Sequence, residues 1–232
     1  MQTKYFPVAT ALIIIIIVNA VIFVIGILSG EQTQIIQNYG FIPNHIFNTH
    51  DYGDNNNAQQ NPLTSLQQSS ELQSPASSLS LSDFITRLFS SMFIHAGIAH
   101  IAFNLFALAY LGGYAERAIG APRYVLIYFS SGIVAALFHG AIASYILNNG
   151  NVVLIGASGA ISGVFGIAAV AGNTKAYYWL VLQIVFAVIG SISALPIAFT
   201  AHVGGFIAGV LTTKVLVKLE QSKRESGYFL QS

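Results

Sequence analysis

Six apolar runs, each about 20 residues long, constrain this chain more than any other feature of its sequence. They lie at approximately 7–29, 92–113, 124–147, 152–172, 177–195 and 196–217. A helix needs about 20 apolar residues to cross the hydrocarbon core of a bilayer, which is about 30 Å thick. Only 7% of the residues are charged, whereas soluble domains average about 25%. The sequence therefore predicts an all-α membrane protein, in which residues 1–232 form one membrane domain with a bundle of six transmembrane helices.

The first run is interpreted as a retained helix and not as a signal peptide. Its apolar core is longer than the roughly 7–15 residues of a signal-peptide core, and no small-residue cleavage site follows it.

Positive charge predicts how the helices are oriented. Of the nine Lys and Arg residues, only Arg87 lies in the loop 30–91 that joins the first two runs. Cytoplasmic loops of membrane proteins carry an excess of Lys and Arg. We therefore expect a multi-pass protein of the cell membrane, with both termini cytoplasmic and loop 30–91 on the exported side. The net charge of +1 gives no indication of a nucleic-acid partner.

The long loop contains a polar insertion at residues 53–82. This stretch is rich in Asn, Gln and Ser and holds too few apolar residues to build a core. Such composition is typical of flexible segments, so we interpret it as a flexible surface insertion.

Polar residues inside the second run are candidates for function, because polar side chains in a membrane span need partners or water. His100 and Asn104 are four residues apart, so a helix places them on one face. His95 lies five residues before His100, so its side chain is expected to point well away from that pair.

A serine and a histidine lie in two further runs. Ser158 stands between Gly156 and Gly159, and His202 lies in the last run. Membrane helices associate closely through small residues at four-residue spacing. Two pairs have that spacing: Gly159 with Gly163, and Gly205 with Gly209. Contact between these faces would bring Ser158 to His202; the alternative is that the glycines serve packing alone and the serine bonds a carbonyl one turn back.

A serine beside a neutral histidine is the minimum for an activated nucleophile. His100, Asn104 and the backbone N–H of Ser158 would supply donors for a developing oxyanion. Apart from Glu116 at the inner end of the second run, the runs contain no Asp or Glu, so a catalytic dyad is predicted. The absence of cysteine excludes thiolate chemistry. No metal site and no cofactor is predicted, because HExxH-type spacing does not occur.

Together these motifs resemble the rhomboid intramembrane serine proteases over about residues 82–217. The matching patterns, in chain order, are HxxxxHxxxN from His95 to Asn104, YLGG before Glu116, GASG at 156–159 and AHVGGFIAG at 201–209. The resemblance implies a rhomboid-type six-helix bundle whose short fourth helix lies beneath a water-filled cavity open to the exported side.

The resemblance also implies roles for individual residues. Ser158 would be the nucleophile and His202 the general base and acid. His100 and Asn104 would be oxyanion donors. The expected structural residues near the site are His95, Gly156, Gly159, Gly205 and Gly209.

Two positions depart from the family pattern. Many members carry an aromatic residue four positions after the nucleophile, where it stacks on the catalytic histidine; this chain has Ser162 there. How His202 is held is therefore left open, and Ser162 itself is one candidate. A Trp-Arg pair usual before the second helix is replaced by Thr86 and Arg87, which leaves the positioning of loop 30–91 open.

The other histidines are interpreted without a catalytic role. His45 and His50 are expected on the solvated surface of the exported loop. His139 is expected near the membrane interface, because its sequence context supplies no partner.

The predicted function is endoproteolysis in or near transmembrane segments, through an acyl-enzyme. The expected partners are transmembrane protein substrates and the lipid bilayer, and the oligomeric state is left open. A second hypothesis is a non-proteolytic rhomboid-like protein that binds membrane clients; such relatives commonly lack the serine or the histidine. A third, a small transporter or channel, fits less well because the spans turn apolar below Asn104, Ser162 and His202.

Overall fold

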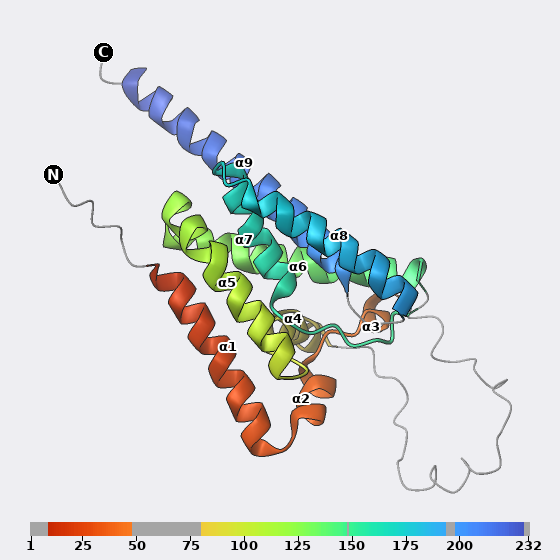
Figure 1. Ribbon diagram of the computed structural model, residues 1–232. Coiled ribbons are helices and arrows are strands. Elements are labelled where there is room, and N and C mark those ends of the chain that lie inside the picture. Colours follow the sequence, from red (N-terminus) through yellow and green to blue (C-terminus); the bar gives the residue numbers. More distant parts are fainter. Residues whose placement is uncertain (1–8, 48–79, 148, 194–197, 230–232) are drawn as a thin grey trace, which may run out of the picture.

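The computed structural model describes residues 9–47, 80–147, 149–193 and 198–229, and helices dominate these ranges (Figure 1). In chain order they are α1 (Thr10–Ser29), α2 (Gln32–Tyr39), α3 (Asn44–Phe47), α4 (Leu81–Ser90), the 3₁₀ turn η1 (Ser91–Phe93), α5 (Ile98–Ile119), α6 (Ala121–Tyr145), α7 (Ser158–Val170), α8 (Lys175–Ser193) and α9 (Phe199–Phe229).

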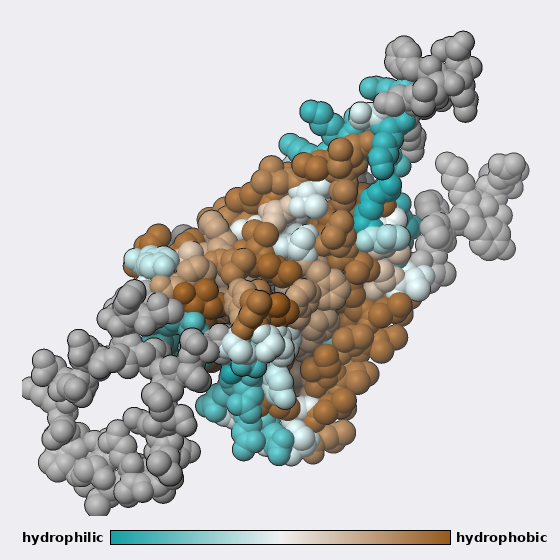
Figure 2. Space-filling model, turned by 180° about the vertical axis from the view of Figure 1, so that it is seen from behind, coloured by the Kyte–Doolittle hydropathy of each residue, from teal (hydrophilic) through white to brown (hydrophobic). Residues whose placement is uncertain are grey.

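Within the described ranges, α1, α5, α6 and α9 as far as Lys223 are long and apolar enough to cross a membrane. Many large apolar side chains on them are exposed, among them Ile14 and Ile17 of α1 and Phe103 of α5. Figure 2 shows hydrophobic residues over the middle of one face, with hydrophilic residues gathered toward its two ends. This distribution suits a surface in contact with lipid, and it confirms the predicted all-α membrane class.

Helix α7 lies at the centre of the bundle and is only 13 residues long. All of its residues from Gly159 to Ala169 are buried. The backbone of α9 approaches it closely: a Cβ at Gly205 would collide with the carbonyl of Gly159, and one at Gly209 with the carbonyl of Gly163. The helix contact predicted from these two pairs of glycines is therefore present, and it brings the two backbones together as small residues allow.

Helices α2, α3 and α4 lie together at one end of the bundle, which we call the α4 end (Figure 1). The Arg87 guanidinium of α4 donates to the carbonyls of Gln37 at 2.8 Å and Gly40 at 2.9 Å. Phe41 and Leu154 form an isolated antiparallel bridge with N···O distances of 3.0 and 2.7 Å. Arg87 thus joins α4 to the segment around α2 despite the departure at Thr86, and the Ser90 hydroxyl of α4 adds a hydrogen bond to the carbonyl of Tyr39 at 2.6 Å.

Glu116 stabilises the opposite end of the bundle. Its carboxylate, only 4% exposed, accepts hydrogen bonds from the backbone N–H groups of Ala11 at 3.1 Å and Leu12 at 2.8 Å. The first N–H groups of a helix have no intrahelical acceptor and carry partial positive charge. A carboxylate from α5 therefore caps α1 and fixes the two helices to each other.

The structure corrects the predicted bounds of three runs. Residues 92–97 of the second run are not α-helical, since η1 ends at Phe93 and α5 begins at Ile98. Residues 152–157 of the fourth run precede α7, because Leu154 pairs with Phe41 and Gly156 takes a φ of 112°. Helix α9 continues past residue 217 to Phe229, since the Lys, Glu, Gln and Arg residues that follow are good helix formers.

The predicted insertion 53–82 lies mostly outside the described residues. Its last two residues, Leu81 and Ser82, are helical and belong to α4. Ser80 caps that helix, because its side chain accepts a hydrogen bond from the backbone N–H of Asp83 at 3.1 Å. The flexible interpretation was therefore wrong for the end of the insertion, where a capping serine starts an amphipathic helix.

Candidate active site

The first residue of α7 and the fourth residue of α9 meet at the centre of the bundle. Ser158 Oγ and His202 Nε2 are 2.7 Å apart, which is a hydrogen-bond distance. The His202 side chain is only 8% exposed. A neutral imidazole with an unprotonated Nε2 accepts the serine O–H in this arrangement.

The segment before Ser158 is held on two sides. Leu154 is paired with Phe41, and the N–H of Gly156 donates to the carbonyl of Ser91 in η1 at 2.8 Å. The positive φ of Gly156, which favours glycine, turns the extended chain toward α7. These contacts fix where the helix starts and so fix the position of Ser158.

The start of α7 also presents backbone donors. The first hydrogen bond of this helix is donated by Ile161 to the carbonyl of Ala157 at 2.9 Å. The N–H groups before Ile161, including that of Ser158, therefore have no acceptor within the helix. They lie at the positive end of the helix dipole, where negative charge is stabilised.

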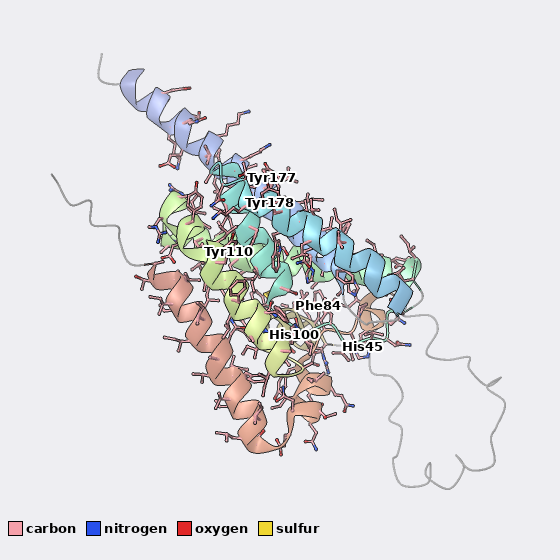
Figure 3. The ribbon with its side chains drawn as sticks, viewed as in Figure 1. His45, Phe84, His100, Tyr110, Tyr177 and Tyr178 are labelled. Carbon is pink, nitrogen blue, oxygen red and sulfur yellow. The ribbon has the colours of Figure 1, made fainter. Side chains whose placement is uncertain are left out.

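His100 and Asn104 lie on α5. The Asn104 side-chain amide donates to the carbonyl of His100 at 2.9 Å and is 5% exposed. His100 Nδ1 accepts from the N–H of Ala96 at 3.4 Å. Its Nε2 faces the serine segment, because a Cβ placed on Gly156 would lie 2.6 Å from that nitrogen. Figure 3 shows His100 near the start of α5, toward the α4 end.

His95 does not point away from His100, contrary to the prediction. It precedes α5, and its ring packs against the His100 ring with a centroid separation of 4.9 Å and an interplanar angle of 70°. The face argument failed because it assumed an unbroken helix through residues 94–97. His95 is 1% exposed, and its carbonyl accepts a hydrogen bond from the side-chain amide of Gln32 in α2.

Ser162 does not hold His202. Its hydroxyl donates to the carbonyl of Ser158 one turn back at 2.8 Å, as serines in apolar helices commonly do. Among the described residues, His202 Nδ1 has no hydrogen-bond partner. The aromatic contact comes instead from Phe199 of α9 itself, whose ring meets His202 edge to face at 6.1 Å between centroids. The i, i+3 spacing of these two residues was the signal that sequence reasoning missed.

Two of the remaining histidines, His139 and His45, differ from expectation. His139 is 8% exposed, and its Nδ1 lies 2.6 Å from Thr200 Oγ1 of α9, so it is buried and has a partner. The partner is 61 residues away, which local sequence context cannot reveal. His45 of α3 is half-buried; burial and then the nearby charge of Arg87 lower its pKa below the ordinary value of 6.5. His50 lies outside the described residues.

Within the part of the chain that the structure describes, no three His, Asp or Glu side chains gather as a metal site would require. The arrangement instead offers an alcohol in contact with an imidazole, two further polar groups on α5, and free backbone donors at the start of α7. These groups are suited to transferring a proton and stabilising an oxyanion.

Comparison with known proteins identifies similar chains. A family model described as Rhomboid domain matches residues 83–219. The protein named Putative rhomboid protease YdcA, from Bacillus subtilis (strain 168), is 30% identical to this chain over 145 residues. The match covers 59% of this chain and 70% of YdcA. Rhomboid protease GluP of the same organism is 33% identical over 137 residues, 56% of this chain and 26% of GluP.

One similar protein is named as inactive. Inactive RHOMBOID-like protein 8 of Arabidopsis thaliana is 33% identical over 129 residues, which is 55% of this chain and 32% of that protein. The chain thus spans about a third or less of the length of this relative and of GluP. A protein named as a protease and one named as inactive are both 33% identical to this chain, so only the site can distinguish the two cases.

Proposed function

The chain belongs to the rhomboid family, and we propose that it is an intramembrane serine endopeptidase. It hydrolyses peptide bonds in or near the transmembrane segments of other membrane proteins. The observation that carries the proposal is the 2.7 Å contact between Ser158 Oγ and His202 Nε2. A serine that served packing alone would not require a hydrogen bond to an imidazole on another helix, and His202 is 44 residues from Ser158 in the sequence.

In the first half of the reaction, His202 Nε2 takes the proton of the Ser158 hydroxyl while Oγ bonds to the scissile carbonyl carbon. The tetrahedral intermediate collapses when the imidazolium gives its proton to the leaving nitrogen and the C–N bond breaks. In the second half, His202 takes a proton from water, whose oxygen attacks the acyl-enzyme. Proton return to Ser158 Oγ releases the new carboxyl end.

The oxyanion is stabilised by donors on two sides. The N–H of Ser158, which has no acceptor within α7, is one. Because His100 Nδ1 accepts from Ala96, the proton of its neutral ring is assigned to Nε2, the nitrogen that faces Gly156. The Asn104 amide has a second N–H beyond the one bound to the His100 carbonyl. The reaction needs no cofactor, since these groups and water supply every proton.

The membrane topology is part of the proposal. Six spanning helices place both termini in the cytoplasm of a cell and open the site to the exported side. Four spans are the long apolar helices α1, α5, α6 and α9. The short α7, of 13 residues, and α8, of 19 residues, would complete the set. Water is proposed to reach Ser158 from the α4 end. Ser158 is the first residue of α7, so no turn of that helix lies between Ser158 and the α4 end.

The alternative is a protein that binds membrane clients without cutting them; one relative, Inactive RHOMBOID-like protein 8 of Arabidopsis thaliana, is named as inactive. The Ser158–His202 contact argues against it. A client-binding protein requires no proton transfer between these groups.

The test uses the full chain purified in detergent, a fluorophosphonate probe and a single-span model substrate. We expect labelling and cleavage by the parent. Ser158→Ala should lose both, and His202→Ala should lower both by about 10³-fold or more. Ser130→Ala is the matched control, because this serine of α6 bonds only its own helix, to the carbonyl of Ile127 at 3.3 Å. Labelling that survives in Ser158→Ala, or binding of the substrate without cleavage by the parent, would contradict the proposal.

A further inference from the structure

Helix α6 packs against both helices that carry the serine and the histidine. A Cβ on Gly159 of α7 would lie 2.6 Å from the Ala135 methyl, and one on Gly205 of α9 would lie 3.4 Å from it. Phe138 covers Gly204 of α9 in the same way, at 2.8 Å. Helix α6 therefore sets the position of α7 and α9 relative to each other.

One polar contact from α6 reaches the first turn of α9. His139 is four residues beyond Ala135 and so lies on the same face of α6. Its Nδ1 is 2.6 Å from Oγ1 of Thr200, the second residue of α9. Thr200 in turn precedes His202 by two residues. A hydrogen bond this short, between a nearly buried imidazole and a hydroxyl, holds that turn at a defined height along α6.

His202 depends on such support more than most catalytic histidines do. In sites of this chemistry a third group usually orients the base through its second ring nitrogen. Here Nδ1 of His202 has no hydrogen-bond partner among the described residues. The direction of the ring is set by its edge-to-face contact with Phe199 and by the backbone of the first turn of α9.

We propose that His139 is a positioning residue: through its hydrogen bond to Thr200 it holds the first turn of α9 so that His202 Nε2 stays within reach of Ser158 Oγ. This inference rests on the proposed function. The bond acts on geometry and not on substrate binding, so its loss lowers the rate of the chemical step while the affinity for substrate is retained.

The experiment compares His139→Ala, Thr200→Val, Thr200→Ser and the double variant His139→Ala with Thr200→Val. Valine matches the shape of threonine without the hydroxyl, whereas serine retains the hydroxyl. We expect kcat to fall about 10-fold or more in the first two, with KM within about 2-fold, since displacing a reacting group is costly. Thr200→Ser should keep most of the parent rate. The double variant should be no slower than the slower single variant, because both remove one interaction.

A second measurement does not depend on activity. Amide hydrogen exchange in peptides that cover the start of α9 should be faster in His139→Ala than in the parent, and exchange in α7 should be unchanged. His45→Ala, a histidine of α3 outside this contact, is the matched control and should leave kcat and exchange at α9 as they are.

Three results would overturn the inference: unchanged exchange at the start of α9 in His139→Ala, a fall in kcat that only follows a fall in thermal stability, or losses that multiply in the double variant. The proposed function is judged separately, by whether the parent shows labelling that depends on Ser158. If it does not, the proposed function fails, and the exchange measurement still decides whether His139 holds the first turn of α9.

Discussion

His202 Nε2 lies 2.7 Å from Ser158 Oγ because two helices meet with almost no side chain between them. The carbonyls of α7 lie where the Cβ atoms of Gly205 and Gly209 would be, so α9 approaches to backbone contact. The chemistry of the site therefore depends on residues that take no part in it.

Gly209→Ala should lower both activity and stability. The added methyl would meet the backbone of Gly163, which cannot rotate away as a side chain would, so α9 must move from α7. Overpacking of this kind costs about 1–3 kcal/mol. Gly113→Ala on α5 is the control, because its methyl meets mainly the flexible Arg117 side chain, at 3.1 Å. Thermal unfolding and cleavage rates measured in the same detergent provide the check, and equal behaviour of the two variants would contradict the packing argument.

Glu116→Ala should destabilise the protein without changing the site. Two backbone N–H groups of α1 lose a buried carboxylate acceptor, and hydrogen bonds to charged groups contribute about 1.5–3 kcal/mol each. Glu116→Gln should cost less, since the amide retains one acceptor oxygen. The melting temperature should fall while kcat of the folded protein stays near that of the parent. A large fall in kcat together with only a small fall in melting temperature would instead link α1 to the site.

Glu220→Gln is the control for that series. Its ion pair with Arg123 has an N···O distance of 3.3 Å, but both side chains are more than a third exposed. Exposed pairs contribute about 0–1 kcal/mol, so this variant should melt close to the parent.

Most of the architecture was accessible from the sequence because it follows from composition and spacing. The lengths of the apolar runs gave the helical membrane class, and the four-residue spacing of the glycines gave the contact of α7 with α9. Both signals are local or periodic, and a single sequence displays them directly.

The contacts of individual polar groups were not accessible in the same way. Thr200 is 61 residues from His139, and Phe41 pairs with Leu154 at a separation of about half the chain length. No pattern within one segment records such partners. The predicted direction of the His95 side chain was wrong for a related reason. The apolar run continues through residues 92–97, but the backbone there is not α-helical.

The half-buried His45 should make the α4 end sensitive to acid. Burial first, and then the positive charge of Arg87, lower its pKa in the folded protein below 6.5. The unfolded chain therefore binds this proton at a higher pH than the folded chain does, so stability falls as pH drops below about 6.5. Above about pH 6.5, His45 contributes nothing to the pH dependence of stability. Titration of the His45 ring protons by NMR should show the lowered pKa, and Arg87→Gln should raise it toward 6.5. A ring that titrates at or above 6.5 in the parent would contradict both statements.

Gly156→Ala and Gly172→Ala form a matched pair that separates backbone strain from obstruction of the site. Both glycines have positive φ, 112° and 90°, so alanine is strained at each position by about 1–2 kcal/mol. A methyl on Gly172 meets nothing within 4 Å, whereas one on Gly156 would press on the His100 ring at 2.6 Å. The two variants should lose similar stability, but only Gly156→Ala should also lose cleavage, because it displaces a proposed oxyanion donor beside Ser158. We expect a fall of about 10²-fold in kcat, the cost typical of one such donor. Thermal unfolding and steady-state cleavage of both variants measure the two effects independently. If Gly172→Ala loses as much activity as Gly156→Ala, strain alone explains the loss and His100 has no part in it.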